Sequence, residues 1–290
     1  RVRLRIGNSS EVIEAVAGQR AHFDARLFEA KAHAGQARSA AEIRAFLGEG
    51  ERPERREGRI QERYSIRCAP HVIGVLLDAL PFCRGVLETE INGASDNPLV
   101  DPDTGDVLHG GNFYGGHVCM VADTLKTQVA NLADLLDRQL VLLNHPETSG
   151  LPENLVVSTD EDRYAHHGFK AMEITASALA AEALKLTMPA SVFSRSTEGH
   201  NQDKVSMGSI AAFDFLRILE LTEYVASVHA IACAQAVELR GLDKVSAPVR
   251  ALHALVRSEV AMMDEDRPMD ADIERVRALL AGERFAVELP

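Results

Sequence analysis

The chain has 290 residues, of which 46% are hydrophobic and 26% are charged, and its formal net charge is −12. This composition is typical of a globular protein with a sizeable core, and an acidic chain without a basic stripe is a poor candidate for binding nucleic acid. No apolar run reaches about 18 residues, so we expect no membrane-spanning helix. The four widely spaced cysteines and an N-terminus without the apolar region of a signal peptide favour a cytoplasmic protein with reduced thiols.

The first third of the chain predicts short helices and one exposed loop. Residues 9–48 carry two short helical patterns around the sequence HAGQ at 33–36, and the charged stretch 49–62 is typical of a loop. The polar stretch 61–74 runs into an apolar one, from which a helix is expected to continue to about Glu90.

Residues 91–116 differ from their surroundings because they are rich in turn-forming Asn, Asp, Gly and Pro. The pairs LV at 99–100 and VL at 107–108 flank the sequence DPDTGD, and this spacing predicts a small β-hairpin near 99–108. It is the one piece of sheet that we expect.

The rest of the chain is expected to be helical. Apolar residues recur at steps of three and four along one helix face, at Leu125, Val129, Leu132, Leu136, Leu140 and Leu143. Further helices are predicted at 169–188, 209–240, 246–263 and 270–282, with Pro189 and Gly241 as stop signals. We therefore predict an all-α fold, a long antiparallel helical bundle with the one hairpin, and a single helical region over residues 1–290.

Three polar stretches interrupt the apolar pattern, at 61–74, at 88–117 and at 196–208. Each has a plain structural interpretation: Tyr64 and Arg67 would form a surface pair on a helix, and STEGHNQDKVSMG would be a solvated linker with Asp203 or Ser206 as the next helix's N-cap. Amide side chains beside His and Glu are costly to bury unless they are hydrogen-bonded, so the third stretch also hints at a buried polar site.

Other kinds of site find no support. The sequence has no HExxH motif, no P-loop, no GxGxxG after a strand and no GxSxG elbow. The neighbours His166 and His167 would point about 100° apart on a helix, which makes a poor metal pair. We expect no metal.

Taken together, the three polar stretches resemble the aromatic amino acid lyases, which include histidine, phenylalanine and tyrosine ammonia-lyases and 2,3-aminomutases. The matching motifs occur in one order from about Ser10 to Asp272: HAGQ at 33–36, QERYSIRCAPH at 61–71, EIN and DNP within 90–98, GGNF at 110–113, and HNQD with VSMG at 200–208. The resemblance implies an all-α fold, a homotetramer whose sites draw on more than one subunit, and the prosthetic group 4-methylideneimidazole-5-one (MIO). MIO is the electrophile of the family and is made from an Ala-Ser-Gly triad.

The chain departs from the family because it contains no Ala-Ser-Gly. The nearest match, Thr148-Ser149-Gly150, lies in HPETSGLPENL, which resembles an ordinary loop before a helix. We therefore expect the chain to correspond to the C-terminal part of a larger lyase domain, without the MIO-bearing part and the loop of the catalytic tyrosine, and to be inactive alone.

The resemblance also implies roles for residues that are present. Arg67 would bind the substrate carboxylate through its two parallel donors. Tyr64 would contact MIO or move a proton, and Gln61 and Asn92 would hold MIO or the carboxylate. Phe113 would pack near MIO and exclude water. Glu198 would accept a proton from the substrate amine or position that amine. Asn201 and Gln202 would contact the substrate.

Gln202 bears on the substrate. Histidine ammonia-lyases usually have Gln-Glu-Asp where this chain has Asn201-Gln202-Asp203, as in the phenylalanine and tyrosine enzymes. An amide offers no charge to an imidazolium, so a non-ionic aromatic ring is favoured, and Phe or Tyr ammonia-lyase is the main expectation. Histidine ammonia-lyase, a 2,3-aminomutase and a non-catalytic partner of a MIO-bearing chain remain alternatives. His71, where the family often has Gln, has no explanation from the sequence.

Overall fold

The computed structural model describes residues 2–48, 60–158 and 161–282. Within them it confirms an all-α fold with one small hairpin. The loop predicted at 49–62 lies almost wholly outside the described residues and stays a prediction. None of the described helices combines the length and the apolar character needed to cross a membrane.

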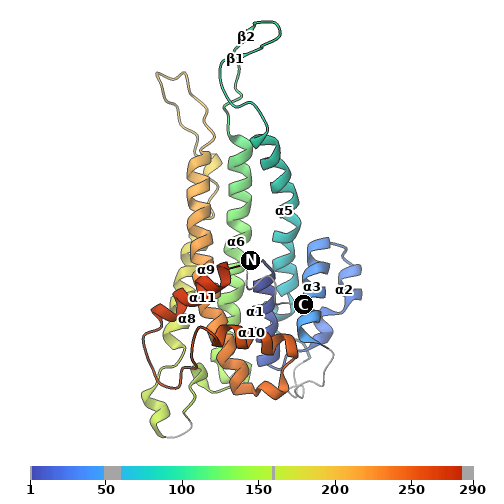
Figure 1. Cartoon of the computed structure of the whole chain (residues 1–290), viewed down its shortest axis with the longest axis vertical. Helices are drawn as coiled ribbons and strands as arrows, with labels where there is room; N and C mark the ends of the chain where they lie inside the picture. Colours follow the sequence, from blue (N-terminus) through green and yellow to red (C-terminus); the bar gives the residue numbers. More distant parts are fainter. Residues whose placement is uncertain (1, 49–59, 159–160, 283–290) are drawn as a thin grey trace.

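Four long helices make the body of the molecule: α5 (Ala69–Ile91), α6 (Gly116–Asn144), α8 (Lys170–Lys185) and α9 (Gly208–Arg240). Helix α6 contacts the other three and is therefore the central one. The connection from α5 to α6 and the connection from α8 to α9 both lie at the same end of the molecule (Figure 1). Consecutive helices in each pair are therefore antiparallel, as predicted.

The shorter helices surround the other half of these long ones. They are α1 (Val2–Ala15), η1 (Arg20–Phe23), α2 (Ala25–Glu29), α3 (Ala34–Leu47), α4 (Tyr64–Arg67), α7 (Pro146–Ser149), η2 (Glu153–Leu155), η3 (Glu161–Ala165), η4 (Ala190–Val192), η5 (Leu242–Lys244), α10 (Ala247–Arg257) and α11 (Asp270–Ala281). Helices α10 and α11 lie away from the end that carries the two long connections (Figure 1).

The predicted hairpin is confirmed and forms the tip of the molecule (Figure 1). Strands β1 (Leu99–Val100) and β2 (Val107–Leu108) are antiparallel, with Leu99 opposite Leu108. The Asp101 carboxylate accepts hydrogen bonds from the backbone of Asp103 at 2.9 Å and of Thr104 at 3.3 Å. An Asp at the start of a turn stabilises it in this way.

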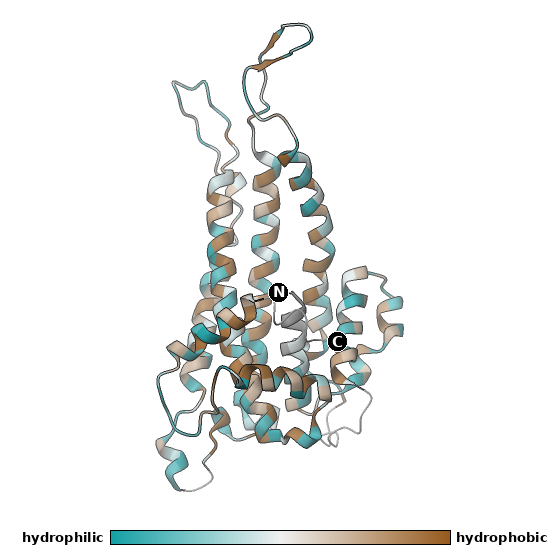
Figure 2. Ribbon diagram, in the orientation of Figure 1, coloured by the Kyte–Doolittle hydropathy of each residue, from teal (hydrophilic) through white to brown (hydrophobic). Residues whose placement is uncertain are grey.

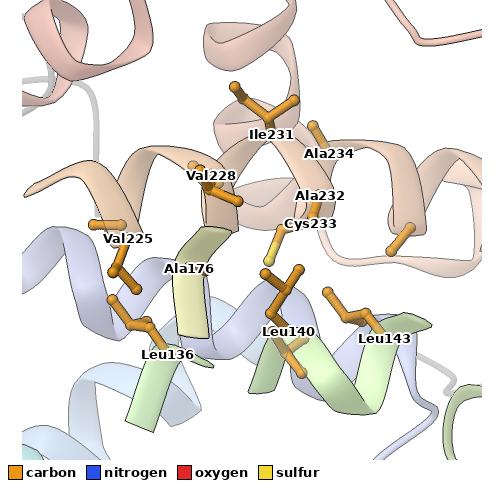
Figure 3. Packing of buried hydrophobic residues seen from close by; sticks show 14 of the residues in the cluster. Leu136, Leu140, Leu143, Ala176, Val225, Val228, Ile231, Ala232, Cys233 and Ala234 are labelled. Atoms are coloured by element: carbon orange, nitrogen blue, oxygen red, sulfur yellow. The ribbon is translucent and has the colours of Figure 1, made fainter. Parts of the chain in front are cut away.

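The core is built from the leucine face of α6 and from α9. Leu136, Leu140 and Leu143 of α6 are at most 1% exposed and pack beside Val225, Val228 and Ile231 of α9 (Figure 3). All residues at 225–237 of α9 are buried, so this part of the helix is covered on every side. A helix that is apolar all round is typical of such a central position.

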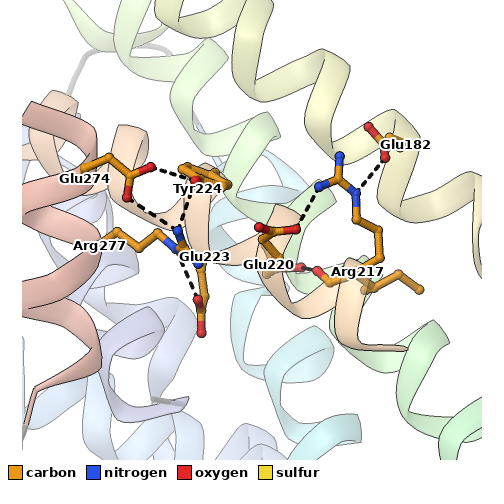
Figure 4. A network of polar contacts seen from close by, with 9 residues as sticks. Glu182, Arg217, Glu220, Glu223, Tyr224, Glu274 and Arg277 are labelled. Carbon is orange, nitrogen blue, oxygen red and sulfur yellow. Dashed lines mark hydrogen bonds and ion pairs between the residues drawn. The ribbon is translucent and has the colours of Figure 1, made fainter. Parts of the chain in front are cut away.

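Ion pairs join α9 to its neighbours at the surface (Figure 4). Arg217 contacts Glu182 of α8 at 2.9 Å, and Tyr224 donates a hydrogen bond to Glu274 of α11 at 2.6 Å. The guanidinium of Arg277 lies over the Tyr224 ring at 4.5 Å. These contacts are partly exposed, so each contributes little alone, and they mainly fix the relative orientation of the helices.

The part of α5 and α9 nearest the hairpin projects beyond the shorter helices, and hydrophobic segments run along it (Figure 2). Large apolar side chains are exposed there: Leu80, Phe82 and Ile91 on α5, and Ile210, Phe213 and Leu216 on α9. Phe213 is 70% exposed. Several large apolar side chains exposed on neighbouring turns are typical of a protein–protein interface.

One predicted helix limit is wrong. Helix α10 ends at Arg257, not near 263, because the apolar residues Val260 and Met263 are buried from an extended segment. The Gln235 amide holds that segment by accepting from the Met263 N–H and donating to its carbonyl, both at 2.9 Å. Helix α9 begins at Gly208, one residue from the predicted limit, and its N-cap is Met207 rather than the Asp203 or Ser206 of the plain structural interpretation.

Candidate active site

Four of the predicted site residues meet at the end of the molecule that carries the hairpin. Phe113, Glu198, Asn201 and Gln202 line one hollow of about 610 Å³. The hollow is also lined by Asp96, Asn97, Tyr114, Asp203 and Lys204. It therefore joins the DNP and GGNF motifs to the HNQD motif, about 100 residues later in the chain.

The loop that carries Glu198 has a defined shape. Thr197 and Gln202 exchange backbone hydrogen bonds of 2.9 and 3.2 Å and so close a tight turn. Glu198, Gly199 and His200 inside the turn have φ of 52°, 60° and 69°. The left-handed region costs a non-glycine residue about 1 kcal/mol or more, and such conformations are often found at functional sites.

The other wall of the hollow comes from the base of the hairpin. The Asn97 side-chain oxygen accepts a hydrogen bond of 2.8 Å from the Gly110 N–H, which ties the two sides of the hairpin together. Phe113 is 56% exposed and Tyr114 is 42% exposed, so both aromatic rings face solvent in the single chain. An aromatic ring at the rim of a polar hollow is suited to contacting a flat substrate.

A second group of predicted residues lies around α4. Arg67 donates a 2.9 Å hydrogen bond from Nε to the Glu62 carbonyl, and its guanidinium lies 4.6 Å from the centre of the Tyr64 ring. Tyr64 is 71% exposed and Gln61 is exposed. Holding Nε in this way fixes the Arg67 side chain while leaving its terminal nitrogens, which bind carboxylates, for another partner.

Tyr64 borders a different cavity, of about 530 Å³, that also holds Gln36 and His71. Burial and the nearby Lys31 lower the pKa of His71. The His71 ring packs on Phe28 at a centroid distance of 5.3 Å. His71 therefore has a packing role, which the sequence did not reveal.

The two groups are far apart in one chain. Arg67 precedes the first turn of α5, while Asn92 is the C-cap at its other end and donates to the Glu88 carbonyl at 2.7 Å. A helix of this length spans roughly 35 Å. Residues 195–204 are all exposed in the single chain, just before the start of α9, so the assignment of this polar stretch to an active site stays a prediction.

The Thr148-Ser149-Gly150 triplet does not fit a precursor of MIO. The Thr148 hydroxyl shares its one hydrogen between the carbonyls of Leu142 and His145, at 2.7 and 2.9 Å, and the Ser149 hydroxyl donates to the His145 carbonyl at 3.1 Å. Gly150 caps α7 in the left-handed conformation. These three residues are needed to end α6 and α7, and both hydroxyl side chains are buried. In the described part of the chain, no three His, Cys, Asp or Glu residues are grouped as metal ligands.

Sequence comparison places these observations in a family. The signature described as "Aromatic amino acid lyase" matches residues 6–258, and the chain belongs to this family. The chain is 40% identical over 267 residues to a histidine ammonia-lyase of Paracidovorax citrulli, covering 91% of this chain and 51% of the relative. The chain thus spans about half the length of the curated relatives it matches.

Solved structures of the family share the fold. The histidine ammonia-lyase of Trypanosoma cruzi superposes with a TM-score of 0.88 at 31% identity, covering 98% of this chain and 53% of that one. A tyrosine aminomutase from Streptomyces globisporus superposes with a TM-score of 0.89 at 31% identity, covering 100% of this chain and 60% of that one. The relatives found by the two comparisons thus include histidine ammonia-lyases and a tyrosine aminomutase.

Proposed function

We propose that this chain forms part of an aromatic amino acid ammonia-lyase that eliminates ammonia without oxidation, with histidine as the first substrate to test. The observation that carries the proposal is the convergence of Phe113, Glu198, Asn201 and Gln202 on one hollow. The family membership and the identity to histidine ammonia-lyases support the reaction class.

The charged ends of the substrate would be held by residues around α4 and by residues that line the hollow. Arg67 would bind the α-carboxylate through two parallel charge-assisted hydrogen bonds, which fixes the α-carbon. Glu198 would accept a hydrogen bond from the α-amine and take up its proton. Asn201 and Gln202 would contact the ring, and Phe113 would cover it and exclude water, which strengthens the polar contacts.

Since Arg67 and Glu198 are far apart in one chain, we propose that each site combines residues of several copies, as a homotetramer. The exposed apolar residues of α5 and α9 lie next to the hollow's end of the molecule and supply a surface for this contact (Figure 2). Burying them removes apolar area from water, which favours association.

The family's prosthetic group MIO supplies an electrophile when bound, and its precursor triad is absent from this sequence. The residues present suit a group brought in by another segment or chain. The Tyr64 hydroxyl and the Gln61 amide are exposed donors, and Asn92 offers its free amide oxygen. Gln61 and Tyr64 of one copy and Asn92 of another copy would hold the group, since the two positions lie at opposite ends of α5, and Tyr64 would also move a proton at its hydroxyl oxygen.

A second candidate is a lyase or 2,3-aminomutase acting on Phe or Tyr. Gln202 favours it, because a neutral amide gives an imidazolium no ion pair. The likeness to a tyrosine aminomutase adds support.

The test is an assay of the protein that bears this sequence, in an assembly that also contains an Ala-Ser-Gly triad. Histidine, phenylalanine and tyrosine are supplied separately, and urocanate, cinnamate, coumarate and β-amino acids are measured. Urocanate from histidine supports the proposal, and cinnamate or coumarate supports the second candidate. An assembly with a formed MIO that turns over none of them would show that this chain is a non-catalytic partner.

A further inference from the structure

The side chain of Lys126, in the middle of α6, is completely buried. A buried ammonium is costly unless all of its donors are paired. Lys126 Nζ donates to the Met188 carbonyl at 2.7 Å and lies 2.9 Å from Asp123 Oδ1 and 3.5 Å from Asp214 Oδ2. Three acceptors match its three N–H groups.

Asp123 extends this network to the backbone. Its two carboxylate oxygens accept hydrogen bonds from the N–H groups of Ala190 and Ser191 at 3.0 and 3.1 Å. Burial alone would raise the pKa of Asp123, but the Lys126 ammonium and these two N–H groups outweigh it and lower the pKa. The carboxylate therefore stays charged and holds the start of η4 against α6.

The network binds the chain at both ends of the loop 193–207. Met188, Ala190 and Ser191 lie just before the loop 193–207, and Asp214 lies in the second turn of α9, just after it. The same two ends are also packed together. Ala190 and Ala211 form a small apolar cluster with Cys119 and Ala122 of α6, and Met207 lies against it.

The loop itself has few other contacts among the described residues. Residues 195–204 are exposed, and hydrogen bonds within the loop join its own members, such as Thr197 with Gln202 and Val205 with Ser194 at 3.0 Å. Such bonds fix the shape of the loop but not its place. The loop borders the base of the hairpin across the hollow, and it is attached to α6 where the chain enters and leaves it.

We infer that Lys126 is a positioning residue, which acts through Asp123, Asp214 and the backbone at 188–191 to place Glu198, Asn201 and Gln202 for substrate binding. This inference rests on the proposed function for what the loop contacts. The attachment of the two ends of the loop to α6 through Lys126 and Asp123, here called the clamp, rests on the contacts alone. Replacing Lys126 alone leaves the largely buried Asp123 carboxylate without its cation and therefore also lowers global stability. A positioning role is distinguished from a stabilising one by an effect confined to the loop.

The first test compares Lys126→Met with Arg257→Met in the full chain. Arg257, the last residue of α10, is also in a largely buried ion pair, 2.7 Å from Glu238, but that pair lies at the C-terminal end of α9, away from the loop. Hydrogen exchange of residues 193–207 and tryptic cleavage after Arg195 and Lys204 are measured. Lys126→Met should speed exchange in the loop by about tenfold or more, and Arg257→Met should leave it unchanged, because local opening depends on local contacts.

Two further variants keep the inference testable if Lys126→Met does not fold. Asp123→Asn weakens both backbone contacts while keeping the side-chain shape, and it should speed loop exchange like Lys126→Met. Asp214→Asn removes only the longest contact and should have a smaller effect, about threefold. Loop exchange that is unchanged in Lys126→Met and Asp123→Asn, or raised equally by Arg257→Met, overturns the inference.

The second test uses a preparation with lyase turnover. Per folded protein, Lys126→Met should lower kcat/KM by about tenfold or more, and Arg257→Met should change it by less than about twofold. If wild type turns over no aromatic amino acid while loop exchange responds as expected, the proposed function fails and the clamp stands. If turnover is present but kcat/KM is unchanged in Lys126→Met, the positioning role is wrong.

Discussion

Gly35 and Gly74 bring α3 and α5 into backbone contact. A Cβ on Gly74 would lie 2.5 Å from the Gln36 amide nitrogen, and a Cβ on Gly35 would overlap the Gly74 carbonyl oxygen. Real Cβ atoms essentially never approach that closely, so the two helices can meet only where both residues lack a side chain. The HAGQ sequence at 33–36 thus has a packing function.

Gly74→Ala should therefore destabilise the fold by about 2 kcal/mol or more, because the helices must separate to admit the methyl group. Gly85→Ala, in the same helix, is the matched control. A Cβ at Gly85 meets nothing within 4 Å, so this substitution should stabilise the helix by about 0.5–1 kcal/mol. Chemical denaturation of both variants checks the pair. Equal effects would contradict the backbone contact.

Arg67→Ala in an active assembly should lower kcat/KM, with a loss of transition-state stabilisation of about 2–4 kcal/mol. The reason is that a charge-assisted bidentate contact to the substrate carboxylate is lost. Arg138→Ala is a suitable control, since Arg138 borders the neighbouring cavity and pairs with Asp134 at 3.2 Å. Steady-state kinetics of both variants decide the point. A change below about twofold for Arg67→Ala would make it a surface residue.

His229 should make the fold sensitive to mild acid. Burial lowers its pKa from 6.5 to about 3. Between these values the unfolded chain binds a proton that the folded chain does not, so stability falls as the pH falls, by up to about 1.4 kcal/mol per pH unit. His229→Leu should flatten the dependence of the free energy of unfolding on pH below about 6.5. Above pH 7 the two curves should run parallel, and an unchanged slope at lower pH would contradict the prediction.

Residues 1–290 alone should release no ammonia from histidine, phenylalanine or tyrosine. The sequence contains no Ala-Ser-Gly, and the hydroxyls of Thr148 and Ser149 are committed to backbone carbonyls. Assay of the purified chain with each amino acid is sufficient. Turnover above background would reveal a second electrophile in this sequence.

The chain should self-associate through the projecting parts of α5 and α9. Phe213→Asp should weaken association, because a charge replaces a ring that is 70% exposed in the single chain. Leu27→Asp, at an exposed apolar residue of α2 away from that region, should leave it unchanged. Sedimentation velocity over a concentration series measures both, and a wild-type chain that stays monomeric throughout would refute the prediction.

Much of the fold could be predicted from the sequence because its signals are local. The leucine spacing of α6, the Gly241 stop after α9 and the turn residues of the hairpin each depend on a few neighbouring residues. The end of α10 could not be predicted in this way, since Val260 and Met263 continue an apolar pattern but are held in an extended segment by Gln235, about 30 residues earlier.

The candidate site was predictable only in part. The motifs that line the hollow are visible as polar stretches, yet the distance between Arg67 and Glu198 depends on the length and direction of α5. Lys126 escaped notice, although a sign was present: it lies on the apolar face of α6, four residues after Ala122 and three before Val129. A lone lysine at such a position must find buried acceptors.

The distance between the Arg67 and Glu198 groups has a genetic consequence. Each site would take its Arg67 from one copy and its Glu198 from a different copy. A substitution of Arg67 in one copy would then inactivate only the sites that receive Arg67 from that copy, and the same holds for Glu198. Two inactive alleles, Arg67→Ala and Glu198→Gln, would then complement each other when expressed together. In the mixed assemblies some sites would receive a sound Arg67 and a sound Glu198, and activity would return in part without any reversion.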